Sequence, residues 1–63
     1  MNKKTVICIS DVLGYSDEIV IGHTYIMDVL TLWSLMDGTW CADILTTEGR
    51  KIGSVDIAHF REV

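Results

Sequence analysis

The chain has 63 residues, which is enough for one domain but no more, and a domain of this size buries only about 60% of the surface of its unfolded chain. Hydrophobic residues make up 49% of the chain, and nine acidic against five basic residues give a net charge of −4. The scattered positive charges disfavour nucleic acid as a partner, because duplex binding needs a stripe of Lys and Arg. Two cysteines are too few for the disulfide framework of a small secreted domain.

Residues 5–10 are β-branched and apolar, which predicts a first strand with apolar side chains on both faces. The apolar run ends at Ser10, too early for a signal peptide or a membrane span. We therefore expect a soluble, cytoplasmic protein. Residues 11–18 have the composition of an exposed loop with Tyr15 at its centre, and residues 19–22 form a short extended piece ending in a glycine.

The segment from residue 23 to residue 30 has an ambiguous period. Tyr, Ile, Val and Thr dominate its first half, which favours a second long strand. A helical stripe over residues 26–36, ended by Gly38, is the alternative. With the strand chosen, residues 33–38 become the tip of a hairpin arm.

Residues 40–45 alternate in polarity, which predicts a strand with Trp40 among the inward-facing side chains. Residues 46–49 supply a turn, and residues 50–55 return as the partner strand. Gly53 inside this strand indicates a bulge or a close approach of another group to the backbone.

The end of the chain is expected to form one 3₁₀ turn and a closing strand. Asp56 is suited to cap the turn, Phe60 is expected to point inward, and residues 61–63 complete the sheet. Together these elements predict an all-β protein, a small barrel of about five short antiparallel strands formed by residues 1–63 as a single domain.

The order of these features resembles a known group of proteins. A first strand with a cysteine is followed by a glycine and tyrosine step, an acidic glycine turn and an aromatic residue before the last strand, here at Cys8, Gly22 to Tyr25, Glu48-Gly49-Arg50 and Phe60. This pattern is similar to that of the small SH3-like barrel proteins of bacteriophages and mobile elements. The resemblance implies an SH3-like fold, and it implies little about activity because most such proteins have no known function. The segment over residues 28–39 departs from the pattern by being longer and more apolar.

Chemistry-bearing residues give no catalytic or metal motif. The cysteines and histidines, at Cys8, Cys41, His23 and His59, are not spaced as zinc ligands, which predicts buried thiols and histidines at element ends. Ser54 and His59 are the one local pair of nucleophile and base, without a nucleophile elbow or a phosphate-binding loop. The sequence thus predicts a protein that is not an enzyme and has no cofactor.

The apolar arm is the best candidate for contact with a partner. The predicted partner-binding residues are Trp33, Leu35, Met36, Leu32 and Tyr15, because large exposed side chains dominate the energetics of interfaces. The predicted partner is a second copy of the chain or a host protein. Two alternatives are nucleic-acid association through the basic residues Lys3, Lys4, Arg50, Lys51 and Arg61, and sequestration of a small ligand in a pocket.

Overall fold

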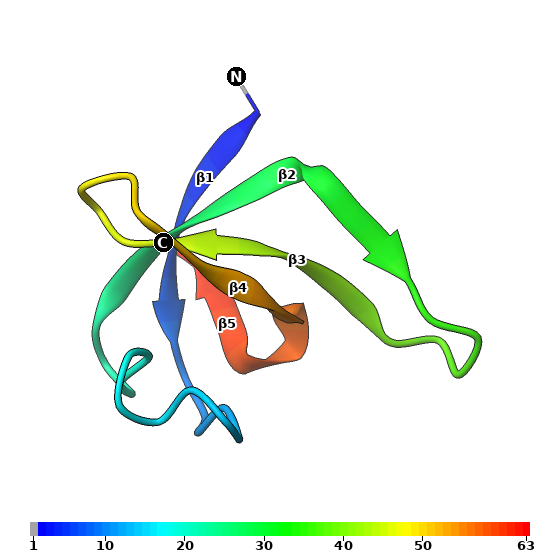
Figure 1. Cartoon of the computed structure of the whole chain (residues 1–63), viewed down its shortest axis with the longest axis horizontal. Coiled ribbons are helices and arrows are strands. Elements are labelled where there is room, and N and C mark those ends of the chain that lie inside the picture. The colour runs from blue at the N-terminus through cyan, green and yellow to red at the C-terminus, as the bar shows by residue number, and fades with distance from the viewer. Residues whose placement is uncertain (1) are drawn as a thin grey trace.

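The computed structural model describes residues 2–63 and contains five β-strands and one 3₁₀ helix (Figure 1). The strands are β1 (Lys3–Cys8), β2 (Thr24–Ser34), β3 (Trp40–Leu45), β4 (Lys51–Asp56) and β5 (Phe60–Glu62), and η1 (Ile57–His59) is the 3₁₀ helix. The all-β class and the 3₁₀ turn before the last strand are confirmed.

The strands form one antiparallel sheet in the order β4-β3-β2-β1-β5. β4 and β5 are the two edges and do not pair with each other, so the sheet is open and the predicted barrel is wrong. β5 has only three residues, all paired with β1 on one edge, and within residues 2–63 no strand pairs with its other edge.

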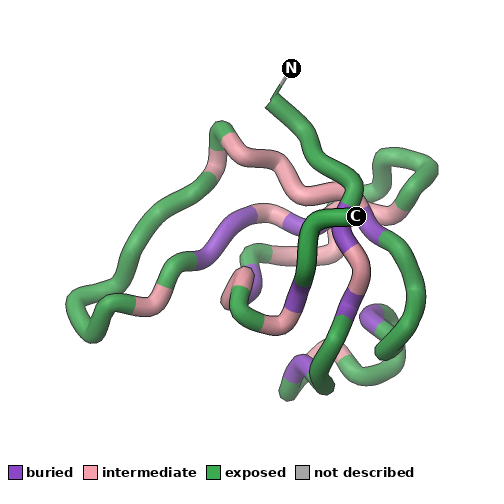
Figure 2. Tube along the Cα trace, turned by 180° about the vertical axis from the view of Figure 1, so that it is seen from behind, coloured by how far each residue is buried: buried purple, intermediate pink, exposed green. Residues whose placement is uncertain are grey.

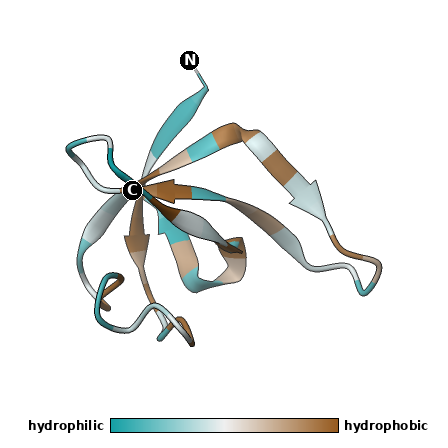
Figure 3. Ribbon diagram, in the orientation of Figure 1, coloured by the Kyte–Doolittle hydropathy of each residue, from teal (hydrophilic) through white to brown (hydrophobic). Residues whose placement is uncertain are grey.

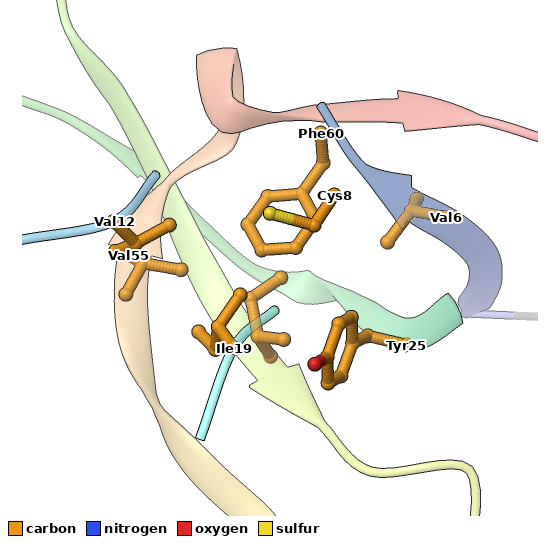
Figure 4. Close-up of a cluster of buried hydrophobic side chains, with 8 residues drawn as sticks. Val6, Cys8, Val12, Ile19, Tyr25, Val55 and Phe60 are labelled. Atoms are coloured by element: carbon orange, nitrogen blue, oxygen red, sulfur yellow. The ribbon is translucent and has the colours of Figure 1, made fainter. Parts of the chain in front are cut away.

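The hydrophobic core covers one face of the sheet (Figure 4). Each strand contributes at least one buried side chain to it, from Val6 and Cys8 in β1, Tyr25 in β2, Ile44 in β3, Val55 in β4 and Phe60 in β5. The rings of Tyr25 and Phe60 meet edge to face at a centroid distance of 6.2 Å. β1 carries apolar side chains on both faces, but they are not equally covered: Val6 and Cys8 are buried in the core, whereas Ile7 on the other face is half-buried.

The segment over residues 9–23 folds over this face and is more than an exposed loop. Val12 and Ile19 from this segment are buried in the core. The hydroxyl of Tyr25 holds the segment in place, since it accepts from the Val20 N–H at 2.8 Å and donates to the Glu18 carbonyl at 3.1 Å. Val12 and Ile19 are isolated apolar residues among residues typical of turns, so the sequence pattern does not predict their burial.

Element boundaries shift by a few residues from those expected. β1 begins earlier because Lys3 pairs with Asp28, and it ends at Cys8 rather than at Ser10. Residues 19–22 form a bend and a turn rather than an extended piece. The strand interpretation of residues 23–30 is confirmed, and the helical alternative is wrong.

The last connection has the expected chemistry. The Asp56 side chain accepts from the Ala58 N–H at 2.9 Å and so caps η1. Phe60 follows directly and is buried. The capped turn thus reverses the chain over three residues and places the Phe60 ring in the core.

Gly53 allows the Tyr15 ring to approach the sheet. The register of β3 and β4 shifts beside it, and a Cβ on Gly53 would lie 2.6 Å from the Tyr15 hydroxyl oxygen. We expect Gly53→Ala to displace this ring and to lower the free energy of unfolding by about 1 kcal/mol, measured by urea denaturation. In a Tyr15→Ala background the same change should cost much less, and equal costs in the two backgrounds would contradict this contact.

Candidate interaction surface

A two-stranded ribbon extends beyond the covered part of the sheet and is called here the arm (residues 30–40). It consists of the second half of β2, the turn over residues 35–39 and the first residue of β3. Figure 1 shows it leading away from the other strands, and Figure 2 shows that most of it is exposed.

A large bulge in β2 directs the arm away from the sheet. Asp28 lies opposite Asp43 and Trp33 lies opposite Cys41, so that four residues of β2 face one residue of β3. Two side chains stabilise this bulge. Asp28 Oδ1 accepts from the Leu30 N–H at 3.1 Å, while Thr31 Oγ1 donates to the Asp28 carbonyl at 2.7 Å and accepts from the Asp43 N–H at 2.8 Å. The bend is therefore held by specific hydrogen bonds and is not a frayed strand end.

Large apolar side chains gather on the arm and face solvent. Met36 at the tip is fully exposed, at 108%, and Leu30 is 73% exposed. Leu32, Trp33, Leu35 and Trp40 are also exposed. The only charged residue in the arm is Asp37. Figure 3 shows hydrophobic stretches in the second half of β2 and at the turn of the arm, with paler stretches between them. The exposed apolar side chains give the arm the character of an interaction surface.

The two tryptophans lie on opposite faces of the ribbon. Trp33 is paired with Cys41, and its indole Nε1–H donates to Ser54 Oγ at 3.0 Å, so it lies across the face that is opposite the core. Trp40 is paired with Ser34, one position along, and therefore points to the other face. Both faces of the arm thus present an indole ring.

Trp40 was expected inside the core and is 47% exposed, so that prediction is wrong. The alternation of β3 does place it on the same face as the buried Ala42 and Ile44. It lies at the start of the strand, however, where the bulge has already carried β2 away from the core. Sequence periodicity indicates on which face of the sheet a residue lies, but not how far along the strand the hydrophobic core covers that face.

The turn of the arm is closed by backbone and side-chain hydrogen bonds. The Leu35 N–H donates to the Thr39 carbonyl at 2.7 Å, and Gly38 takes a φ of +90°. The Thr39 N–H donates to Asp37 Oδ1 at 2.9 Å, and this bond lowers the pKa of the Asp37 carboxyl below 3.8. Because the folded pKa is lowered, the bond stabilises the turn fully above pH 3.8 and is lost as the pH falls through the lowered value.

Two hollows lie beside η1 on either side of Asp56. One, of about 340 Å³, is bordered by the turn of the arm, Trp40 and η1. The other, of about 330 Å³, is bordered by residues 11–15, the end of β4 and His59. Carboxylates of Asp11, Asp37 and Asp56 line them, and no Lys or Arg does. The small-ligand alternative has these two hollows as its candidate sites and stays a prediction.

The structure brings together four of the five predicted partner-binding residues. Leu32, Trp33, Leu35 and Met36 are all on the arm. Tyr15 lies elsewhere, partly buried against the core and over Gly53. Leu30 and Trp40 are the other two large apolar residues that are exposed on the arm.

Nucleophilic and metal-binding groups are arranged differently from the sequence pattern. Ser54 Oγ is the acceptor for the Trp33 indole, whereas His59 Nδ1 lies 2.8 Å from Ser10 Oγ. No sequence signal joins residues 10 and 59. Cys8 and Cys41 are free and buried, as expected. Among residues 2–63 no three His, Cys, Asp or Glu side chains gather as metal ligands, and none of the helices described there has the length and apolarity to cross a membrane.

Two of the basic residues are paired with acids. Lys4 Nζ lies 3.5 Å from Glu62 Oε2, and Lys51 Nζ lies 3.4 Å from Asp43 Oδ2. Both members of the Lys4–Glu62 pair are exposed, so this pair contributes at most about 1 kcal/mol, whereas the Asp43 side chain of the second pair is only 19% exposed. The nucleic-acid alternative needs these same lysines and stays a prediction.

These features define a small all-β protein with an open five-stranded antiparallel sheet and an exposed apolar arm. Comparison with known protein families, with curated proteins and with solved structures found no match.

Proposed function

We propose that this chain is a non-enzymatic protein-interaction module that associates with a second copy of itself through the arm. The observation that carries the proposal is the set of large apolar side chains held in solvent on a ribbon that the Asp28 and Thr31 hydrogen bonds fix in place. The proposal includes an SH3-like type, as in small proteins of bacteriophages and mobile elements. The strand order and the 3₁₀ turn before β5 support that type.

The free energy available at the arm is large for so small a protein. Burying one exposed Leu, Met or aromatic side chain contributes about 1.5–3 kcal/mol. The arm carries six such side chains that are exposed, at Leu30, Leu32, Trp33, Leu35, Met36 and Trp40. In a symmetric dimer both copies bury those members of the set that lie on the contacting face, which can offset the cost of association, about 4–15 kcal/mol.

The arm is almost uncharged, so a second copy of the chain fits it better than a partner that is recognised through its charges. The arm has one carboxylate, that of Asp37, and no basic residue. A basic or acidic partner would find little on the arm to pair with, whereas an identical apolar surface brings few charges together. This is the reason for choosing self-association over a host protein.

Trp33→Asp tests the proposal. We expect it to raise the dissociation constant of the dimer by about 30-fold, because loss of an interface anchor costs about 2 kcal/mol or more. Thr47→Asp, on the exposed turn between β3 and β4, is the control with the same change in charge. The measurement is sedimentation equilibrium, with circular dichroism to show that the sheet is retained.

Trp33 also donates a hydrogen bond to Ser54, so its replacement could affect folding as well as association. A second variant therefore tests association without changing this bond. Met36 is fully exposed, so Met36→Asp removes apolar surface without disturbing the sheet. It is expected to weaken association in the same direction. Equal dimer fractions in Met36→Asp, Trp33→Asp and Thr47→Asp would show that the arm is not the contact.

A further inference from the structure

We infer that the arm joins two copies by strand pairing: the outer backbone edge of β2 over residues 30–34 forms an antiparallel ladder with the same edge of a second copy. This inference rests on the proposed function and specifies how its contact is made. Side-chain packing alone could also join two arms, so the backbone edge is a separate claim with its own test.

The outer edge of β2 is free along the arm. β1 pairs with β2 from Thr24 to Asp28, and the last bond along this side runs from the Val29 N–H to the Asn2 carbonyl at 2.7 Å. Within residues 2–63, β3 is the only strand that pairs with β2 beyond this point. The edge over residues 30–34 therefore has no partner strand within the described part of the single chain, and it is bent at residues 29–32 by the bulge.

The hydrogen-bonding groups of Ser34 point outward along this edge. The Leu35 N–H donates to the Thr39 carbonyl, on the β3 side. The Ser34 carbonyl belongs to the same peptide unit and points the opposite way, and the Ser34 N–H lies on the same side as its carbonyl. Ser34 is exposed, and within residues 2–63 no strand pairs with this side of it, so this donor and this acceptor have no partner strand in a single chain.

The two other edges of the sheet carry features that discourage pairing. β4 begins with the charged Lys51 and has a register shift at its start, beside Ile44 and Leu45. β5 has only three residues, two of which are charged. Short length, charges and bulges are the devices by which sheet edges avoid other chains. The arm edge contains the bulge over residues 29–32, but residues 29–36 have no charge and no proline, so it lacks the protection that charges give the other two edges.

The distribution of charge fits a second copy as the occupant. In an antiparallel ladder centred within residues 30–34, every residue that meets its counterpart is uncharged. The two Asp37 carboxylates, beyond the ladder, lie at opposite ends of it. A two-fold axis then makes the contact self-complementary, which is the commonest symmetry of protein dimers.

Amide hydrogen exchange of the unaltered chain, followed by NMR at rising concentration, tests the ladder. We expect the Ser34 amide to exchange at least about tenfold more slowly when the dimer predominates, because its N–H gains an acceptor. The Trp33 amide faces β3 in the single chain and is the internal control, expected to be protected at every concentration.

Ser34→Pro and Ser34→Ala form the matched pair of variants. Proline removes the outward N–H without removing a bond to β3, and edge strands tolerate it at such positions. We expect Ser34→Pro to raise the dissociation constant by at least about tenfold and Ser34→Ala to leave it nearly unchanged.

The outcomes separate this inference from the proposed function. A dimer whose Ser34 amide exchanges as fast as in the single chain overturns strand pairing and leaves association through the arm intact. Absence of any dimer overturns both. If Ser34→Pro does not fold, the exchange measurement on the unaltered chain still decides.

Discussion

Phe60→Ala is expected to lower the free energy of unfolding by about 3–5 kcal/mol. Phe60 is buried at the start of β5, where it lies beside the ring of Tyr25 and opposite Cys8 in the ladder. Alanine removes the ring and leaves a cavity that a small core closes only in part. A core of this size supplies roughly 3–5 kcal/mol in total, so the variant should be largely unfolded without denaturant.

Circular dichroism across a urea titration measures the effect of Phe60→Ala. Leu13→Ala is the control, because Leu13 is also a large apolar residue but is 91% exposed. Its expected effect lies within about 0.5 kcal/mol. A Phe60→Ala protein with the midpoint of the unaltered chain would show that β5 does not anchor the core.

Tyr25→Phe is expected to lower the free energy of unfolding by about 1–3 kcal/mol, although it removes a single oxygen atom. That oxygen accepts from the Val20 N–H and donates to the Glu18 carbonyl, both in the segment over residues 9–23. Phenylalanine leaves these two backbone groups without their partner. The cost falls first on the segment that brings Val12 and Ile19 over the core.

Urea denaturation, together with hydrogen exchange at the Val20 amide, measures this effect. Exchange at Val20 should become faster in Tyr25→Phe even under conditions where the sheet is intact. Tyr15→Phe is the matched control, since it also removes a tyrosine hydroxyl but none that bonds residues 18–20. If the two variants were equally stable, the Tyr25 hydroxyl would have no special role.

Much of the fold follows from local signals in the sequence. The β-branched residues near the start of the chain predict β1, and the alternating polarity of residues 40–45 predicts β3. The turn at Glu48-Gly49 predicts that β4 follows as its hairpin partner, and the structure contains all three strands. The capping side chain of Asp56 and the inward Phe60 are also local features, and both are confirmed.

The errors arise where the outcome depends on distant pairing. Barrel closure depends on whether β4 meets β5, and no pattern within either strand encodes that. The hydroxyl of Thr31 accepts from the Asp43 N–H, a contact between residues separated along the chain, and the bulge that it stabilises decides that Trp40 stays in solvent. Periodicity cannot report such a bulge.

The candidate surface was partly readable because an apolar run without charge is unusual next to a turn. Leu32, Trp33, Leu35 and Met36 were identified on that ground, and the structure places all four on the arm. Tyr15 was chosen for its position in a loop, but it is packed against the core. Its contact with Gly53 depends on the way residues 9–23 fold back, which sequence spacing does not show.

The molar mass of the unaltered chain as a function of concentration tests self-association most directly. In sedimentation equilibrium from micromolar to millimolar protein, the mass is expected to rise from the 7.1 kDa of one chain toward twice that value. The Trp33→Asp protein should remain nearer 7.1 kDa across the same range. A mass of 7.1 kDa for the unaltered chain at every concentration would contradict the proposed function.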